Sequence, residues 1–120
     1  MVTVTPYIPA QITVHLGPPT ASAANVTVSF ADYVKNVASS EIYPTWEDSA
    51  LVANILAIIS FALNRFYTEY YRSRGYDFDI TSSTAYDQFF VRGRSFFSNV
   101  SRLVDELFNS YLRRPGFVEP

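Results

Sequence analysis

The chain has 120 residues, which suits one ordinary domain, and its hydrophobic content of 48% is too high for a wholly disordered protein. Nine basic and eleven acidic side chains give a net charge of −2, which excludes a basic surface that would bind nucleic acid or an anionic membrane. The sequence contains no Cys and a single histidine, His15, which excludes disulfides, thiol catalysis and a multi-histidine metal site. We therefore expect no metal and no cofactor.

Residues 1–28 are predicted to form an extended or β segment, because they carry no charge and four of the seven prolines. Polar and apolar residues alternate over 11–16 and again over 25–30, which is the pattern of two short strands. The Gly-Pro-Pro sequence at 17–19 ends the first strand. The two strands can pair as an N-terminal hairpin.

From residue 29 onward the apolar residues follow the helical period, so residues 29–120 are predicted to form a helical domain. Ser29, with Asp32 three residues later, predicts the start of a first helix. The end of that helix is predicted before Pro44, because the residue that precedes a proline is disfavoured in a helix.

The longest predicted helix runs from about 46 to 74, with Thr45 as its N-cap and Gly75 as its C-terminal stop. Its first half is apolar on nearly every side, which indicates a central helix surrounded by other elements. A short helix over 82–90 and a final helix over 95–113 are expected to cover it. The predicted fold class is therefore mostly α, a small single domain around a central apolar helix with an N-terminal β-hairpin or extended segment.

The most apolar stretch, residues 50–63, has 14 residues, whereas a membrane-spanning helix needs about 20. No secretory signal is visible, because residues 1–6 hold neither a basic region nor an apolar run. We therefore expect no membrane insertion. The low charged fraction of 17% leaves apolar surface for a partner to cover, so a homo-oligomer is a further expectation.

Glu41 is the first candidate for chemistry, since it follows a predicted helix and has small and apolar neighbours without a basic partner nearby in sequence. Burial beside Tyr43 and Trp46 would favour the protonated form of this carboxyl group, as a general acid requires. The two aromatic rings can also stack on a sugar ring. The alternative is a solvated glutamate at a helix C-terminus, and residue type and spacing alone favour it.

Two further groups of side chains have a functional and a structural interpretation. Asp77 and Asp79 would point to the same side of an extended segment and bind a cation or a hydroxyl-rich ligand, or else close a turn through their own backbone. Arg72 and Arg74 follow a tyrosine-rich stretch, and forked arginine donors with aromatic rings suit a glycan or a carboxylated ligand. The more frequent explanation is that the rings pack and the arginine stems cover them. His15 is expected to be structural.

Three segments carry a family resemblance: VASSEIYPTW at 37–46, SALVAN at 49–54 and SFAL at 60–63. Together they resemble the stage II sporulation protein D family, also called the SpoIID/LytB domain. Residues 72–81 look like the subgroup in which such a domain is joined to peptidoglycan-binding modules. The chain resembles the N-terminal part of that domain.

The resemblance implies a lytic transglycosylase that acts on peptidoglycan glycan strands. In that family the motif glutamate is the catalytic acid/base, and it matches Glu41. This carboxyl group is then expected to protonate the glycosidic oxygen and, as a base, to help the muramic acid 6-hydroxyl close a 1,6-anhydro ring. Tyr43, Trp46, Arg72 and Arg74 are the residues we expect to bind the strand. The implied location is the cell envelope or the spore.

Departures from the family pattern leave a second function open. Val52 and Ile59 stand where the family's helix carries Lys and Arg, and Asn54 replaces a glutamine. The sequence ends at Pro120, before the glycine- and Cys-containing segment with which family members complete the cleft, and it shows no peptidoglycan-binding module. The sequence therefore leaves open whether this is an enzyme or a non-catalytic helical module that self-associates through apolar surface.

Overall fold

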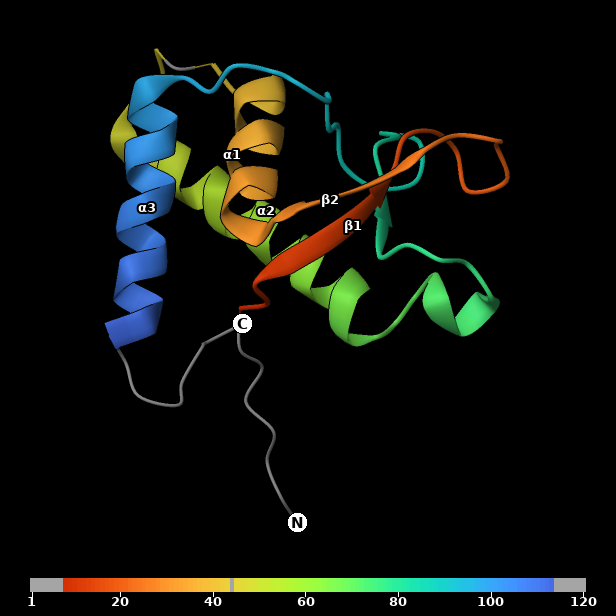
Figure 1. The fold of residues 1–120 in the computed structure, drawn as a ribbon. Helices are drawn as coiled ribbons and strands as arrows, with labels where there is room; N and C mark the ends of the chain where they lie inside the picture. Colours follow the sequence, from red (N-terminus) through yellow and green to blue (C-terminus); the bar gives the residue numbers. More distant parts are fainter. Residues whose placement is uncertain (1–7, 44, 114–120) are drawn as a thin grey trace.

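The structure, a computed structural model, describes residues 8–43 and 45–113, with side chains up to Asn109. In Figure 1, α1 and α3 stand side by side, α2 crosses behind them, and the sheet lies at one side. The elements follow in the order β1 (Gln11–His15), β2 (Asn25–Ser29), α1 (Phe30–Glu41), α2 (Asp48–Tyr67), the 3₁₀ turn η1 (Arg72–Arg74), β3 (Ile80–Thr81) and α3 (Ser98–Arg113).

The predicted N-terminal hairpin is confirmed. β1 and β2 pair antiparallel along their whole length. Ile12 and Val14 of β1 are buried, as the alternation of the sequence predicts. β1 is the middle strand of the sheet, so the hairpin is joined to the rest of the fold through its first strand.

The prediction of a mostly α fold is wrong, because the structure has a mixed α/β fold with a three-stranded mixed sheet of order β2-β1-β3. β3 pairs in parallel with β1, with Val14 opposite Ile80 and His15 opposite Thr81. Two residues are too few to show an alternating pattern. Contact with a strand that is distant in the sequence therefore decides that this segment is a strand.

α1 begins where the sequence predicts. The Ser29 hydroxyl accepts a hydrogen bond from the backbone N–H of Asp32, 3.1 Å away, and so caps the first turn. The predicted inner face is buried, and it consists of Phe30, Tyr33, Val34, Val37 and Ala38.

α2 is shorter at both ends than the predicted helix. It begins at Asp48 with Glu47 as its N-cap, and the predicted cap at Thr45 is wrong. The short helix predicted over 82–90 is also wrong, because this stretch forms turns and irregular chain. The final helix is confirmed, and α3 begins at Ser98, close to the predicted start.

The C-terminal end of α2 is a Schellman motif, a hydrogen-bonded turn that closes a helix. α2 ends at Tyr67, and Glu69 then adopts a left-handed φ of 51°. The N–H groups of Glu69 and Tyr70 bond to carbonyl oxygens of the last helical turn, at 3.2 Å each. Gly75 does have a left-handed φ of 90°, but it ends η1 rather than α2.

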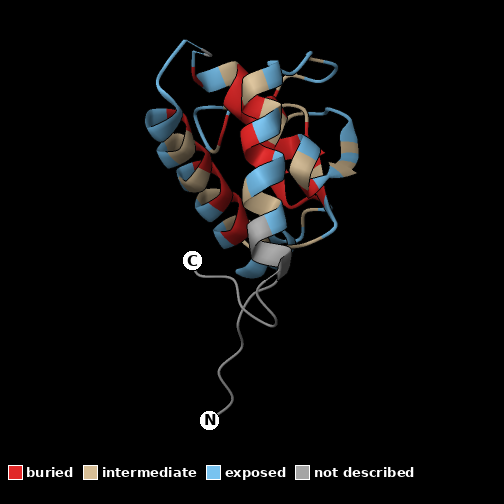
Figure 2. Cartoon of the chain, turned by 90° about the vertical axis from the view of Figure 1, so that its left-hand side faces the viewer, coloured by how far each residue is buried: buried red, intermediate tan, exposed pale blue. Residues whose placement is uncertain are grey.

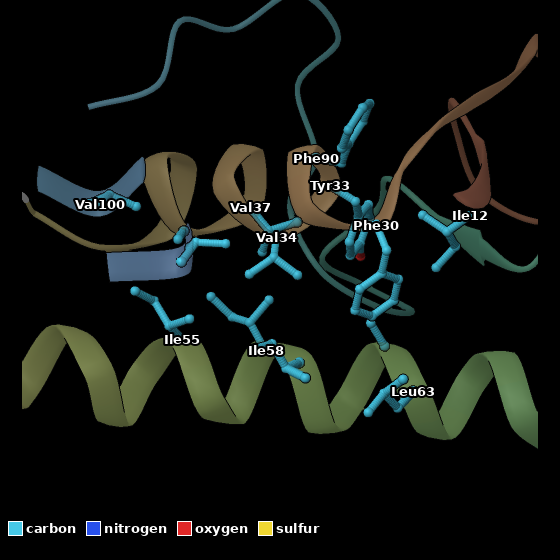
Figure 3. Packing of buried hydrophobic residues seen from close by; sticks show 14 of the residues in the cluster. Ile12, Phe30, Tyr33, Val34, Val37, Ile55, Ile58, Leu63, Phe90 and Val100 are labelled. Atoms are coloured by element: carbon cyan, nitrogen blue, oxygen red, sulfur yellow. The ribbon is translucent and has the colours of Figure 1, made fainter. Parts of the chain in front are cut away.

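The hydrophobic core lies between α2, the other two helices and the sheet. Figure 3 shows Ile55, Ile58 and Leu63 of α2 pointing toward the side of α1 that carries Phe30 and Val37. Figure 2 shows buried residues on the inward sides of the helices and exposed residues on their outward sides. Each buried side chain of this size stabilises the fold by about 1.5–3 kcal/mol.

α2 is not covered on every side, in contrast to the expectation from its sequence. Ala53, Ala57 and Ser60 are exposed, and 33% of its most apolar window is buried. By length and composition alone, the stretch Asp48–Arg74 suits a membrane-crossing helix, because its most apolar 18-residue window has a mean hydropathy of 1.6; core helices of soluble proteins share this property. The absence of membrane insertion therefore stays a prediction.

Candidate functional site

Glu41 is the last residue of α1, and its side chain is exposed. The burial considered from the sequence is therefore absent. Oε2 of Glu41 accepts a hydrogen bond from the backbone N–H of Phe89, 3.0 Å away. Among the described residues no other group bonds this carboxylate, which leaves Oε1 available to a ligand.

Exposed aromatic rings lie at the same end of α1. Tyr43 and Trp46 are 70% and 40% exposed, and their ring centroids are 6.2 Å apart. Phe89 is 41% exposed. Rings that remain in water can stack on the apolar face of a sugar. Glu41, Tyr43 and Trp46 therefore share one end of the molecule.

Asn36 fastens the irregular segment 86–97 to α1. The Asn36 amide bonds both backbone groups of Val91: Nδ2 donates to the carbonyl oxygen at 2.6 Å, and Oδ1 accepts from the N–H at 2.9 Å. A side-chain amide has the same donor and acceptor as a peptide group, so this pair resembles a rung of a β ladder. In the sequence, the one sign of this attachment is that Asn36 is a polar residue next to the apolar face of the predicted helix.

Ser39 makes a second attachment, which the sequence did not indicate. Its carbonyl oxygen accepts a hydrogen bond from Nη1 of Arg94 at 3.1 Å, and its hydroxyl accepts one from the N–H of Phe97 at 3.2 Å. Ser39 is buried and lies two residues before Glu41. The segment 86–97 is thus held along the part of α1 that leads to the candidate carboxylate.

Arg72 and Arg74 lie elsewhere. They belong to η1, beyond the end of α2, and Figure 1 shows this turn well away from the C-terminal end of α1. Nε of Arg72 donates to Oδ1 of Asp79 at 2.8 Å, and this hydrogen bond raises the pKa of the Arg72 guanidinium. The guanidinium of Arg74 lies 4.0 Å from the ring centroid of Tyr70. The structure does not bring these arginines to Glu41, and their contact with a glycan stays a prediction.

Asp77 and Asp79 do not act as a pair. Asp77 is exposed, whereas Asp79 is buried and its Oδ2 accepts from the N–H of Thr13 at 2.8 Å. Asp79 therefore extends the pairing of β1 and β3 and does not close a turn on its own backbone. Among the described residues, no group of three or more His, Asp or Glu side chains is placed to hold a metal ion. His15 is buried and stacks on Phe78, with 4.4 Å between the ring centroids.

A family model described as "SpoIID: Stage II sporulation protein" matches residues 20–106, which is most of the chain. The chain belongs to the SpoIID family. The match includes all of α1 and α2 and the segment 86–97, and so it contains Glu41 and every attachment described above. Neither a search of curated proteins nor a search of solved structures gave a match.

Membership of the SpoIID family indicates a function related to sporulation or to the cell wall, in the context of the spore or the cell envelope. The geometry of the Glu41 carboxylate at the end of α1 is compatible with acid/base catalysis. A carboxylate with one fixed and one open oxygen can exchange a proton with a ligand oxygen that approaches the open side.

Proposed function

We propose that this SpoIID-family chain binds peptidoglycan glycan strands at the C-terminal end of α1 and cleaves them as a lytic transglycosylase. Glu41 is the acid/base of this proposal. The supporting observation is its exposed carboxylate, which the N–H of Phe89 holds at Oε2. A fixed carboxyl group that remains accessible supports this role, because it can approach a bound ligand for proton transfer. In this proposal the exposed rings of Tyr43 and Trp46, which follow Glu41 in the chain, hold the sugar.

The proposed reaction needs a single carboxyl group. In its acid form, Glu41 donates a proton to the glycosidic oxygen as the bond from this oxygen to the anomeric carbon breaks. The resulting carboxylate then accepts the proton of the muramic acid 6-hydroxyl, whose oxygen bonds to the anomeric carbon and closes a 1,6-anhydro ring. No second carboxylate is needed as a nucleophile, in contrast to glycosidases that use two.

The test is digestion of purified peptidoglycan, both intact and stripped of stem peptides, with the products identified by mass spectrometry. We expect anhydro-muropeptides from the unmodified protein and none from Glu41→Gln. The glutamine amide oxygen can still accept the hydrogen bond from Phe89, so this variant retains the local fold. Glu47→Gln is the matched control, because Glu47 is a nearby exposed carboxylate whose side chain makes no capping bond. Anhydro product from Glu41→Gln would contradict the assigned role.

A second candidate function is a non-catalytic module that assembles through α2. The observation that favours it is the exposed apolar side of α2, which includes Ala53 and Ala57. This alternative predicts that none of the proteins in the digestion forms anhydro product, and that light scattering shows a defined oligomer. A clean monomer would count against assembly.

A further inference from the structure

The segment after β3 contains a tight turn that carries two arginines. The N–H of Arg94 donates to the carbonyl oxygen of Val91 at 3.1 Å. Gly93, at the third position of this turn, has a φ of 78°, and a left-handed third residue is what a type II turn requires. Arg92 and Arg94 flank the glycine, so both guanidinium groups extend from one turn.

α1 holds this turn in place. The amide of Asn36 bonds both backbone groups of Val91, and the carbonyl oxygen of Ser39 accepts from Arg94. Asn36 and Ser39 are themselves buried. Because the backbone of the turn is fixed by buried partners, the turn loses less backbone freedom on binding a ligand than a loose loop would.

A hollow of about 420 Å³ lies against this turn. Its volume falls in the range of small-ligand pockets, about 300–1,000 Å³. Its lining includes two arginines and no aspartate or glutamate; it consists of Val91, Arg92, Gly93, Arg94, Ser95 and Phe97. A second hollow of about 270 Å³ shares both arginines but also includes Asp32, so the first hollow is the more positive of the two.

Within residues 8–43 and 45–113, no carboxylate pairs with either of these two cations. Among the described residues, no hydrogen bond or ion pair involves the exposed side chain of Arg92. Nε of Arg94 is buried without a partner, and the acceptor that its Nη1 does reach is a neutral carbonyl oxygen. The exposed guanidinium of Arg92 is a forked donor without a counter-charge and favours a planar oxyanion, which can accept two parallel hydrogen bonds. The positive charge of Arg94 adds to this preference.

We propose that Arg92 and Arg94 bind a carboxylate of the glycan strand and thereby hold the strand at the end of α1, beside Glu41. This inference rests on the proposed function, because it names the substrate group that the same site recognises. Arg94 bonds Ser39, two residues before Glu41 along α1, and the segment that carries the arginines also supplies the N–H that bonds Glu41. The segment 86–97 thus connects the hollow to the candidate acid/base.

Peptidoglycan offers carboxylates from two sources. Strands stripped of stem peptides carry the free lactyl carboxylate of muramic acid, and intact strands carry the carboxylates of their peptides. Oligomers of N-acetylglucosamine have the same kind of sugar ring but no carboxylate. Comparing these three ligands separates recognition of the anion from recognition of the sugar, and separates the two sources of the anion.

The test measures binding by Glu41→Gln, so that cleavage does not consume the ligand. In this background we expect Arg92→Gln to weaken binding of intact or stripped strands by about tenfold, the size of one lost charge-assisted contact. Binding of the N-acetylglucosamine oligomer should not change. The strand whose binding falls, intact or stripped, identifies the source of the carboxylate. Arg102→Gln is the matched control, since Arg102 is an exposed arginine on α3. This variant should bind each ligand as tightly as Glu41→Gln alone does.

The inference is overturned if Arg92→Gln binds both kinds of strand as the background does, if it weakens the neutral oligomer equally, or if no strand binds. Failure of the proposed function is seen separately in the digestion. The proposed function fails if Glu41→Gln still forms anhydro product, or if the unmodified protein forms none. A strand that binds through Arg92 without being cleaved would support the carboxylate site while rejecting the transglycosylase.

Discussion

Two tyrosine hydroxyl groups have little access to water at the interior of the fold. Tyr33 donates a hydrogen bond to Oε1 of Gln88 at 2.9 Å, and Tyr71 donates one to Oδ2 of Asp87 at 2.6 Å. Burial raises the pKa of both hydroxyl groups, since the charged phenolate form is poorly solvated there, and the negative charge of Asp87 raises both further. These residues should therefore make the stability of the protein sensitive to alkaline pH.

Below pH 10 the stabilisation from these two protonated hydroxyl groups is fully present. Above it, the unfolded chain releases the protons of Tyr33 and Tyr71 while the folded chain keeps them. The free energy of unfolding then falls by about 1.4 kcal/mol per pH unit for each group, until the pH passes the folded pKa. Tyr33→Phe should remove one such contribution from the slope, measured by urea unfolding between about pH 9 and pH 11.5.

The matched control for this slope is Tyr43→Phe. The ring of Tyr43 is 70% exposed, so its hydroxyl is hydrated in both the folded and the unfolded states. Tyr33→Phe also loses the hydrogen bond to Gln88, which costs about 1 kcal/mol at every pH. The slope with pH is therefore the informative quantity, and an unchanged slope in Tyr33→Phe would contradict the expected effect of burial.

Among the secondary-structure elements, α2 shows why a helix boundary is hard to predict. Its sequence continues past Tyr67 with residues that a helix tolerates, and no glycine marks the end. The end is set instead by Glu69, which takes the left-handed position that glycine usually occupies in this motif. A residue with a Cβ atom pays a steric cost there, so the turn is formed against local preference.

Glu69→Gly is predicted to raise the free energy of unfolding by about 0.5–1 kcal/mol. Glycine removes the steric cost of the left-handed backbone, which is about 1 kcal/mol or more, and loses part of the gain through the greater freedom of the unfolded chain. The measurement is the midpoint of thermal unfolding, which should rise by roughly 2–4 °C. Glu69→Ala removes the same charge but keeps the Cβ atom, so it should give no such gain. Equal gains in both variants would assign the effect to the charge.

At the scale of the whole molecule, the sequence predicted what depends on local contacts. The hairpin, the Ser29 cap of α1 and the inner face of that helix follow from neighbouring residues. β3 exists only through its pairing with β1, and the segment 86–97 takes its shape from buried side chains of α1. For the same reason the sequence could group Glu41, Tyr43 and Trp46, which are close together in the chain, whereas the attachment of the turn that carries Arg92 to α1 depends on the fold.

Asp87 bonds to three parts of the chain that are separate in sequence: α2, Tyr71 and β3. Its Oδ1 accepts from Nε of Arg65 in α2 at 2.7 Å. Its Oδ2 accepts from the hydroxyl of Tyr71 at 2.6 Å, and from the N–H and the hydroxyl of Thr81 in β3 at 2.9 and 2.6 Å. The side chain of Asp87 is 0% exposed, so water cannot replace these partners.

Asp87→Asn is predicted to lower the free energy of unfolding by about 3 kcal/mol, measured by urea unfolding at neutral pH. The amide keeps one acceptor oxygen but turns an NH₂ group toward donors, and it leaves the Arg65 guanidinium without its counter-charge. Breaking a buried ion pair by removing one partner costs about 3–5 kcal/mol. The lower end of this range is expected here, because the Arg65 side chain is 19% exposed and water can hydrate part of it. Asp77→Asn, at an exposed carboxylate two residues before Asp79, should change stability by less than about 0.5 kcal/mol. If Asp87→Asn costs no more than this control, the polar network does not hold α2 and β3 together, and the hydrophobic core alone unites the fold.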